Sequence, residues 1–292
     1  MMIENHLFTK GYRKLITHLK QLYSDWSLPE IKQPIFIIGC GRSGTTILGT
    51  AMSYHPQITY LNEPRNLWYS CYPMTDIWTE NAKEKKGKLV MTRVDADPKR
   101  SRKLRQKFYA ITQKSGKPIL IEKLPINTFR LDFISQIFPD ARFIHIVRNG
   151  LEVARSIETL CHQGQWFASH PYKWDLLAEY ASLRQATSTL PTCCESYYEK
   201  GLLEWRLSTE AVFIFKKTFP EARFYEISYK EFLHDPVITM HNIFSFIDIP
   251  MDDRVTDFLF KNVTRRTPEL QNKHLSVKEQ FIGGYLLARI LS

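Results

Sequence analysis

The fold of this chain is decided by residues 34–46, which read PIFIIGCGRSGTT. Residues 35–38 form an unbroken apolar run with three β-branched side chains, a pattern typical of a central strand in a parallel sheet. The glycines at 39, 41 and 44 permit positive φ angles and let an anion approach the main chain closely. Thr45 and Thr46 then begin a helix whose free N–H groups and dipole favour negative charge. The stretch therefore predicts a strand, a loop and a helix that together hold a phosphate.

The composition of the 292 residues narrows the class of protein. With 43% hydrophobic and 24% charged residues, the chain is typical of a globular protein that buries a substantial core. Its formal net charge of +10 suits an anionic ligand, although affinity for nucleic acid or a membrane surface would also produce such a charge. The five cysteines, at 40, 71, 161, 193 and 194, show no repeated CxxC spacing and support neither a zinc site nor a disulfide framework.

The N-terminal part of the sequence bears on the cellular location. Residues 1–23 mix charged and apolar side chains without an unbroken apolar run, so we predict no secretory signal. No run of about eighteen apolar residues occurs, so we expect no transmembrane segment. Residues 11–23 have a helical apolar period, which favours a helix docked on the domain over a helix on a membrane surface. We therefore expect a cytoplasmic protein.

The rest of the chain alternates between strand-like and helix-like patterns. Further strands are predicted at 58–61, 118–121, 142–147 and 223–227, and helices at about 45–54, 131–138, 174–190, 203–218 and 239–247, with one more from 151. Such alternation predicts a single α/β, P-loop-like domain with a central, mostly parallel sheet flanked by helices. We expect one domain over residues 1–292, with an N-terminal helix and connector at 1–33, a core at 34–250 and a basic segment and helix at 251–292.

The phosphate loop differs from that of a nucleoside-triphosphatase. Its spacing, Gly39-x4-Gly44, is that of a P-loop, which continues with Lys and then Ser or Thr. Here Thr45 occupies the lysine position, and a triphosphate-cleaving enzyme needs that lysine on its β- and γ-phosphates. The cation of the loop is instead Arg42, a residue suited to gripping a terminal phosphate through paired hydrogen bonds. The loop thus indicates a phosphate that is bound without a metal.

With these features the chain resembles the sulfotransferases that use 3′-phosphoadenosine-5′-phosphosulfate, and its motifs are most similar to those of the tyrosylprotein or Golgi-type and bacterial members. Residues 39–46 resemble the 5′-phosphosulfate loop, and residues 143–148 through Ser156 resemble the 3′-phosphate element. His55-Pro56, Glu63, Lys123 and residues 229–236 extend the match in family order over roughly residues 34–250. The resemblance implies the sulfate donor as cofactor, adenosine 3′,5′-bisphosphate as its product, and no metal. It implies that the cofactor is bound by Gly41, Arg42, Ser43, Gly44, Thr45, Thr46, Arg148 and Ser156.

The second phosphate element also makes physical sense. Arg148 follows a strand at its carboxyl end, where ligands bind in open parallel sheets. Ser156 lies about two turns into the next helix, so the two side chains are placed to converge on one phosphate. The alternative is a structural ion pair for Arg148 and a packing position for Ser156. His145, within the strand, is expected to be a hydrogen-bonded core residue.

Three residues are candidates for the chemistry, together with their alternatives. A glutamate at the place of Glu63 is the general base in the tyrosylprotein enzymes, which suits a carboxylate within reach of an acceptor hydroxyl. Lys123 resembles a lysine that serves the bridging oxygen in those enzymes, where a fixed cation stabilises the leaving group. Arg42 is the third candidate. Alternatively, Glu63 forms a salt bridge with Arg65, and Glu122 holds Lys123 as a structural pair.

The C-terminal third offers weaker candidates. Tyr229 is expected either to line the nucleotide pocket or to be a core tyrosine. Similar proteins close a basic C-terminal loop over the cofactor, which implies a contact from Arg265, with Arg266 and Lys273 as the other basic residues in this segment. The six basic residues at 99–107 predict a solvated helix face, or alternatively a steering patch for an acidic substrate.

The leading hypothesis is an enzyme that transfers a sulfuryl group to an acceptor hydroxyl in line and without a metal. The alternatives are a small-molecule kinase of P-loop type and a non-catalytic protein that binds nucleotides or polyanions. The acceptor hydroxyl, on a protein tyrosine, a carbohydrate or a lipid, is not specified by the sequence, because the variable region 66–118 would form much of its pocket. The expected partner is this acceptor rather than a nucleic acid, and homodimer formation is left open.

Overall fold

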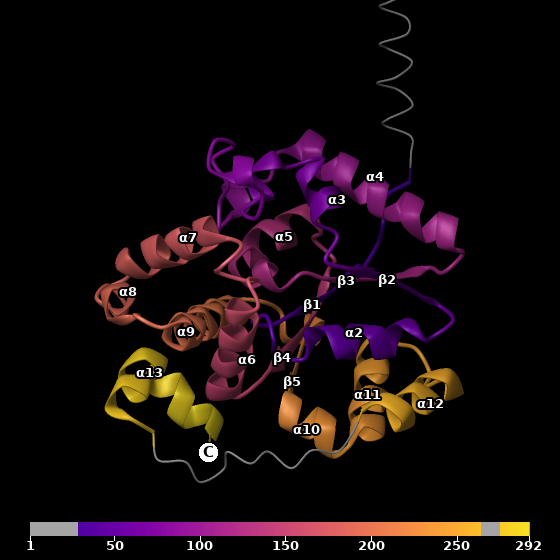
Figure 1. Ribbon diagram of the computed structural model, residues 1–292. Coiled ribbons are helices and arrows are strands. Elements are labelled where there is room, and N and C mark those ends of the chain that lie inside the picture. The colour runs from indigo at the N-terminus through magenta and orange to yellow at the C-terminus, as the bar shows by residue number, and fades with distance from the viewer. Residues whose placement is uncertain (1–28, 264–274, 292) are drawn as a thin grey trace, which may run out of the picture.

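A computed structural model describes residues 29–263 and 275–291. At its centre lies one five-stranded sheet in the order β2-β3-β1-β4-β5, and every strand pair is parallel (Figure 1). The strands are β1 Ile35–Ile38, β2 Ile58–Asn62, β3 Ile119–Lys123, β4 Arg142–Val147 and β5 Phe224–Ser228. The α/β class and the parallel sheet are thereby confirmed. Boundaries of β2 and β5 differ from the predicted ones by one residue. The largest difference is in β3, which continues through Lys123 in register with Ile37 of β1.

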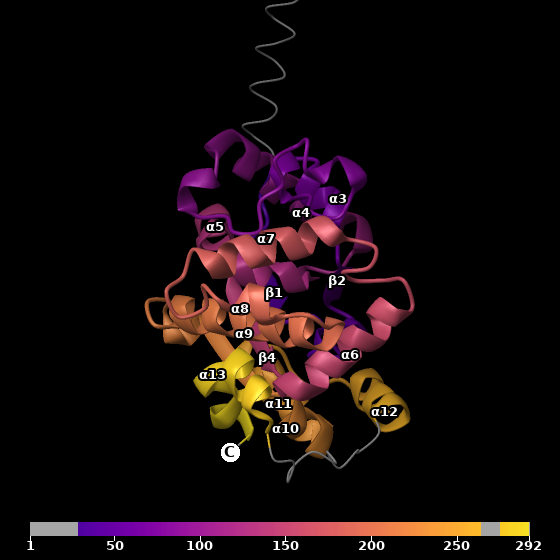
Figure 2. The same ribbon diagram turned by 60° about the vertical axis from the view of Figure 1, so that its left-hand side comes forward.

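Helices cover both faces of the sheet (Figures 1 and 2). Their bounds are α2 Thr45–Ser53, α3 Arg65–Tyr69, α4 Pro98–Ser115, α5 Leu131–Ile137, α6 Gly150–His162, α7 Pro171–Ser182, α8 Leu190–Cys193, α9 Tyr197–Lys216, α10 Tyr229–His234, α11 Pro236–Phe246, α12 Asp253–Asn262 and α13 Val277–Leu291. Short 3-10 helices are η1 Pro73–Thr75, η2 Glu80–Ala82, η3 Arg93–Asp95, η4 Pro125–Phe129 and η5 Glu221–Arg223. None of the helices in these described residues is long and apolar enough to cross a membrane.

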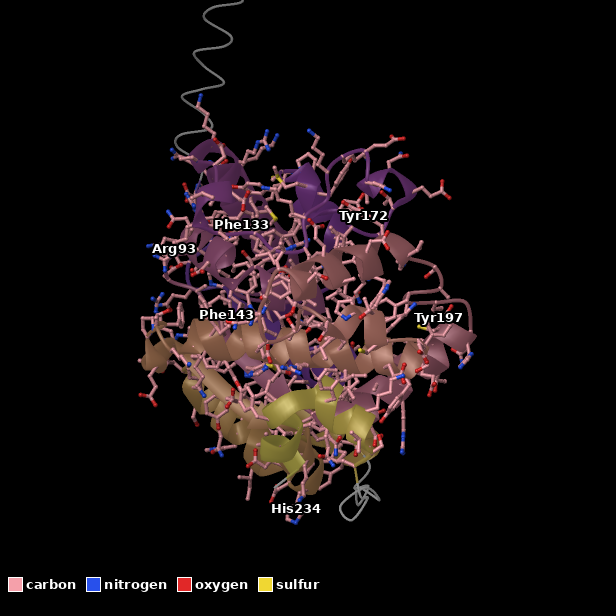
Figure 3. All side chains as sticks on the ribbon, turned by 90° about the vertical axis from the view of Figure 1, so that its left-hand side faces the viewer. Arg93, Phe133, Phe143, Tyr172, Tyr197 and His234 are labelled. Carbon is pink, nitrogen blue, oxygen red and sulfur yellow. The ribbon has the colours of Figure 1, made fainter. Side chains whose placement is uncertain are left out.

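The sheet separates two apolar cores. Ile35 and Ile37 of β1 face the core under α2, α11 and α12, whereas Phe36 and Ile38 face the core under α4, α5, α6 and α9. This alternation is the period-two pattern of a strand that is covered on both faces. Phe143 of β4 belongs to the second core and lies in the interior of the molecule, whereas the exposed His234 lies at its surface (Figure 3).

The helices in residues 171–216 differ from the expected ones. The helix predicted at 174–190 ends at Ser182, and only the short α8 follows it. The helix predicted at 203–218 begins earlier, because a capping box fixes its start: Ser196 Oγ accepts from the backbone N–H of Glu199, and the Glu199 carboxylate accepts from that of Ser196. The resulting 20-residue α9 is the central helix of the larger core.

Helix α9 packs closely on α6 because glycine lies at the crossing. A Cβ on Gly201 would lie 3.2 Å from the backbone of Ala154, so a larger residue would push the helices apart. Trp205 of α9 is fully buried against Gly150, and its indole N–H donates to the carbonyl of Arg148 at 2.9 Å. The end of β4 and the start of α6 are held in place by these contacts.

The remaining structural expectations meet different outcomes. His145 is buried and hydrogen-bonds to Glu226 at 2.9 Å, as predicted for a core histidine. The basic segment 99–107 lies in the first half of α4, where Arg102 and Arg105 pair with Glu30, so its charges form only partly a solvated face. The predicted helix at 11–23 and the basic residues Arg265, Arg266 and Lys273 lie outside the described residues.

Candidate active site

The loop between β1 and α2 has the shape of an anion cradle. Gly39, Arg42 and Gly44 have φ angles of 151°, 71° and 96°, so the chain turns sharply around the loop centre. Gly44 also serves as the N-cap of α2 without any side-chain cap, which leaves the first-turn N–H groups pointing at the loop. Ser43 and Thr45 are buried, whereas Thr46 is exposed at the start of the helix.

Gly41 is required for side-chain packing rather than for the positive φ angle that was expected. Its φ angle is not positive, so no backbone requirement selects glycine there. A Cβ on Gly41 would instead lie 2.4 Å from Cη2 of Trp166, so the missing side chain makes room for an indole from a loop 125 residues further on (166 − 41). The expectation that all three loop glycines serve the backbone turn is therefore wrong for Gly41.

The second phosphate element lies beside the loop. Arg42 Nε donates to Ser156 Oγ at 3.0 Å, and Arg148 Nη1 donates to the carbonyl of Arg42 at 3.0 Å. The structure thus brings Arg148 and Ser156 to the loop, each through Arg42. Arg148 also pairs with Glu152 at 2.7 Å, so the expected structural ion pair exists alongside this contact.

Tyr229 joins the same group of residues. Its ring occupies the space that a Cβ on Gly44 would fill, at 2.4 Å from that position. The guanidinium of Arg148 lies over the ring, 4.6 Å from its centroid, which is a cation–π distance. Tyr229 therefore lies between the loop and the second element, where it is partly buried and also packs against the edge of the smaller core.

Across the loop from these residues, β2 and β3 present the two catalytic candidates. Lys123 Nζ donates to Glu63 Oε1 at 2.9 Å and to Thr46 Oγ1 at 2.9 Å, and its side chain is 1% exposed. Glu63 has a φ angle of 50° directly after β2, which turns it away from the strand direction. Its second oxygen accepts from Arg65 Nη2 at 2.7 Å. Glu63 is thus bound by both cations: the expected salt bridge with Arg65 is present, and Lys123 adds a pair with Glu63 that was not predicted.

The ionisation of Glu63 follows from these partners. Burial by itself raises the pKa of Glu63, but the charges and hydrogen bonds of Lys123 and Arg65 outweigh it and hold the pKa below its ordinary value of 4.5. The carboxylate is consequently ionised at neutral pH, the form in which it accepts a proton.

Glu122 is not the partner of Lys123. Successive side chains of a strand point to opposite faces, and the buried carboxylate of Glu122 accepts from Trp68 Nε1 at 2.8 Å and from Asn127 Nδ2 at 3.2 and 3.3 Å. The expectation of a structural Glu122–Lys123 pair is therefore wrong. Burial raises the pKa of Glu122 to about 8, against the lowering effects of Trp68, Asn127 and Lys123.

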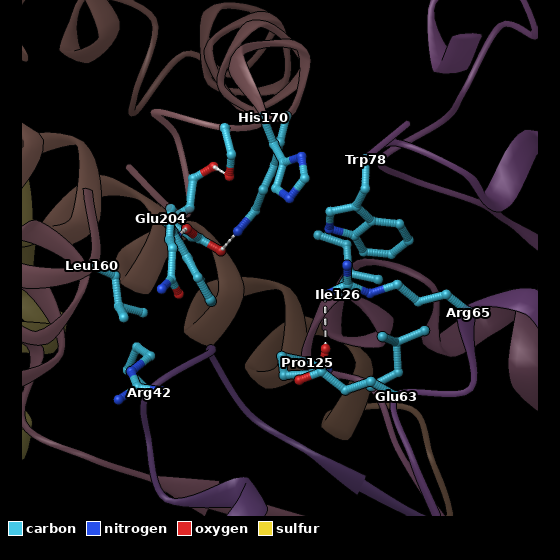
Figure 4. A pocket seen from close by; sticks show the side chains of 14 residues that line it. Arg42, Glu63, Arg65, Trp78, Pro125, Ile126, Leu160, His170 and Glu204 are labelled. Atoms are coloured by element: carbon cyan, nitrogen blue, oxygen red, sulfur yellow. Dashed lines mark hydrogen bonds and ion pairs between the residues drawn. The ribbon is translucent and has the colours of Figure 1, made fainter. Parts of the chain in front are cut away.

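A cavity of about 300 Å³ lies between the loop and Glu63. Arg42 and Leu160 lie on one side of it, and Glu63, Arg65 and Trp78 lie on the other (Figure 4). The cavity is also lined by Leu124, Pro125, Ile126, Gln165, Trp166, Ser169, His170, Lys173 and Glu204. The cavity is therefore lined both by the guanidinium of Arg42 and by the ionised carboxylate of Glu63.

Three residues of the cavity lining, Trp166, Lys173 and Glu204, were not predicted from the sequence; we call the part of the lining that they form the far wall. Trp166, Lys173 and Glu204 come from a loop and from two different helices, α7 and α9, and no motif connects them. A possible signal is charge at helix positions that are otherwise apolar: Lys173 and Glu204 are 5% and 3% exposed.

Comparison with known proteins places the chain in a family. A model of the Sulfotransferase family matches residues 34–253, so the chain belongs to that family. The protein is 25% identical to the protein-tyrosine sulfotransferase 1 of Danio rerio over 227 residues, which are 76% of this chain and 54% of the relative. It is 24% identical to an uncharacterized protein of Aquifex aeolicus over 239 residues, or 78% of this chain and 27% of that protein. The chain thus spans about half or less of these relatives.

Solved structures share the fold at low identity. The sulfotransferase domain from the curacin biosynthetic pathway superimposes with a TM-score of 0.54 at 13% identity, covering 88% of this chain and 98% of that domain. Sulfotransferase STF9 from Mycobacterium avium gives a TM-score of 0.51 at 16% identity, covering 93% of this chain and 77% of that protein. The family model thus shows the family of the chain, and the solved structures show its fold.

Proposed function

We propose that this protein transfers a sulfuryl group from 3′-phosphoadenosine-5′-phosphosulfate to an acceptor hydroxyl on a tyrosine, a carbohydrate or a lipid. The observation that carries the proposal is the position of Glu63 on one side of a cavity whose other side is Arg42, with Lys123 hydrogen-bonded both to Glu63 and to Thr46 of the loop. An acceptor hydroxyl in this cavity would have a base and the phosphate loop as its immediate neighbours.

The residues present fit a donor that carries two phosphate groups. The glycine-bearing loop and the uncapped start of α2 suit one phosphate, while Arg148 and Ser156, brought to the loop through Arg42, suit a second. Tyr229, which fills the space above Gly44, offers a flat surface next to Arg148 for the nucleoside. When bound, the donor supplies a sulfuryl group on a phosphosulfate anhydride, with adenosine 3′,5′-bisphosphate as the leaving product.

The chain's own residues then account for the chemistry. Glu63 takes the proton of the acceptor hydroxyl at a carboxylate oxygen, since Lys123 and Arg65 keep it ionised at neutral pH. Lys123 holds a positive charge next to Thr46 at the start of α2, where it stabilises negative charge that develops on a leaving group. Arg42 contributes the cation of the loop. These fixed cations are why we propose that the transfer needs no metal.

Two measurements test the proposal. Incubation with radiolabelled sulfate donor and a panel of peptides, glycans and lipids should label one acceptor class. Calorimetry should show that adenosine 3′,5′-bisphosphate binds, and that Arg148→Ala weakens binding by about 10- to 100-fold, the effect of losing one charge-assisted contact. Arg155→Ala is a matched control, because Arg155 is an exposed arginine of α6, the helix that follows Arg148.

The alternatives give different outcomes in the same experiments. A non-catalytic binder would bind adenosine 3′,5′-bisphosphate without any labelled product, in the wild type as in Glu63→Gln. A sulfotransferase instead retains binding in Glu63→Gln and loses at least about 100-fold in transfer rate, since general-base catalysis contributes about 10²–10⁴-fold. Absence of any binding by the wild type would refute the proposal.

A further inference from the structure

A buried ion pair lies in the far wall of the cavity. Lys173 Nζ of α7 and Glu204 Oε1 of α9 are 2.6 Å apart, and both side chains are almost fully buried. A buried ion pair is weak support for stability, because desolvation offsets most of its Coulomb attraction. The pair lies among the apolar residues of the larger core, so its position calls for a different explanation.

The ion pair is explained by its contacts with the indole of Trp166, because both Lys173 and Glu204 bind that ring. Trp166 Nε1 donates to the second oxygen of Glu204 at 2.8 Å. The ammonium of Lys173 lies 3.9 Å from the centroid of the Trp166 ring, which adds a cation–π interaction in a desolvated place. The edge and the face of the indole are thus each bound by one member of the ion pair. Its orientation is fixed even though Trp166 belongs to the connection between α6 and α7 and has a φ angle of 57°.

The six-membered ring of the indole rests on the phosphate loop. Cη2 and Cζ2 of Trp166 occupy the space that a Cβ on Gly41 would need, at 2.4 and 2.8 Å. The ring therefore fills the interval between the loop and the Lys173–Glu204 pair. Because Gly41 directly precedes Arg42, this interval adjoins the end of the cavity where an acceptor hydroxyl would react.

We propose, resting on the proposed function, that Trp166 is the specificity-determining residue of the acceptor site and admits only hydroxyls carried by a single ring or a group of similar size. The cavity of about 300 Å³ is at the small end of the range for ligand pockets, about 300–1,000 Å³. A fused four-ring alcohol would need the space of the indole. Glu204 and Lys173 are positioning residues, since they act on the acceptor through Trp166.

The test compares acceptors of different size in variants of Trp166. Single-ring acceptors are phenol, N-acetyltyrosinamide and methyl galactoside, and the large acceptor is the four-ring alcohol androsterone. The transfer of radiolabelled sulfate to each is measured for the wild type, Trp166→Phe and Trp166→Ala. Trp174→Ala serves as the matched control, because Trp174 is a partly buried tryptophan of α7 outside the cavity lining. Calorimetry with adenosine 3′,5′-bisphosphate shows that each variant is folded and binds the nucleotide.

For the wild type we expect kcat/KM for at least one single-ring acceptor to exceed that for androsterone by about 100-fold or more. In Trp166→Ala this ratio falls at least about tenfold, while the affinity for the nucleotide stays within about threefold. Trp166→Phe, which keeps a ring, gives an intermediate ratio and decides the matter if Trp166→Ala does not fold. Trp174→Ala leaves the ratio unchanged.

Several results would overturn this inference. A wild type that binds the nucleotide and sulfates androsterone as well as the single-ring acceptors has no such size limit. A wild type that binds the nucleotide and sulfates none of the single-ring acceptors does not have a site for hydroxyls of this size. An unchanged ratio in a folded Trp166→Ala, or a loss of nucleotide binding in that variant, would assign the indole to loop support. Failure of the wild type to bind the nucleotide would remove the proposed function, and this inference with it.

Discussion

The buried carboxyl of Glu122 makes the stability of this protein depend on pH in an unusual direction. Its pKa is about 8 in the folded protein because of burial, against an ordinary value of 4.5. Between these two values the unfolded chain has lost the proton and the folded protein has kept it. Unfolding therefore becomes easier as the pH rises, by about 1.4 kcal/mol per pH unit for this group.

The substitution Glu122→Gln removes this dependence while keeping the size of the side chain. A glutamine oxygen still accepts from Trp68 Nε1. Its amide N–H₂ donates to Asn127 once the Asn127 amide turns over to present Oδ1, which is buried and has no hydrogen-bond partner in the described structure. From pH 5 to pH 8 the wild type should lose about 4 kcal/mol of unfolding free energy relative to the variant, about 1.4 kcal/mol for each of three pH units. Above about pH 9 the difference becomes constant, since both states of the wild type are then ionised.

Urea unfolding at pH values from 5 to 9 measures this difference directly. Glu179→Gln is the control, because Glu179 is an exposed carboxylate of α7 and its replacement should give a curve parallel to the wild type. If the curves of Glu122→Gln and the wild type are also parallel from pH 5 to 8, the reasoning is refuted. Glu122 would then be ionised in the folded protein throughout this range.

Three further predictions concern the loop, the base and the cavity wall. Gly44→Ala places a Cβ 2.4 Å from the ring of Tyr229 at a positive φ, so unfolding free energy from urea titration should fall by about 1–3 kcal/mol; an unchanged midpoint would contradict the packing. Because the pKa of Glu63 is low, we expect that protonation of Glu63 does not reduce the transfer rate between pH 7 and about pH 5. A rate that halves near pH 6.5 would indicate another base, such as a histidine. Lys173→Met leaves Glu204 buried without its charge partner, so thermal unfolding should show a loss of about 3–5 kcal/mol, part of which returns in the double variant with Glu204→Leu; a stable single variant would show that the pair is dispensable.

The sequence was sufficient to predict the residues that belong to motifs. The loop at 39–46, Glu63, Lys123, Arg148 and Ser156 lie around one place in the structure, because the carboxyl ends of neighbouring parallel strands meet at one edge of the sheet. The order of the strands in the sheet could not be predicted from any local sequence pattern. A parallel sheet was nevertheless sufficient to predict that the loops after these strands lie at the same edge.

What could not be predicted depends on packing between distant segments. Gly41 looks like a turn residue, and only the position of Trp166 shows that it makes room for an indole. The charges of Glu122 and Lys123 suggested that β3 ended before them, although both continue the strand and point to opposite faces. In each case a charged or small residue was explained by a partner from another element, which overrides the local propensity.

The order of the strands also has a consequence for folding during synthesis on the ribosome. The central strand β1 pairs only with β3 and β4, and Ile35 meets partners 86 residues (121 − 35) and 107 residues (142 − 35) further along. During synthesis the apolar residues 35–38 therefore stay unpaired until both later strands have left the ribosome. Long-range parallel pairing of this kind slows folding and exposes aggregation-prone surface. A nascent chain that has not yet exposed β4, which ends at Val147, cannot bury both edges of β1. We therefore expect such a chain to bind a chaperone during synthesis.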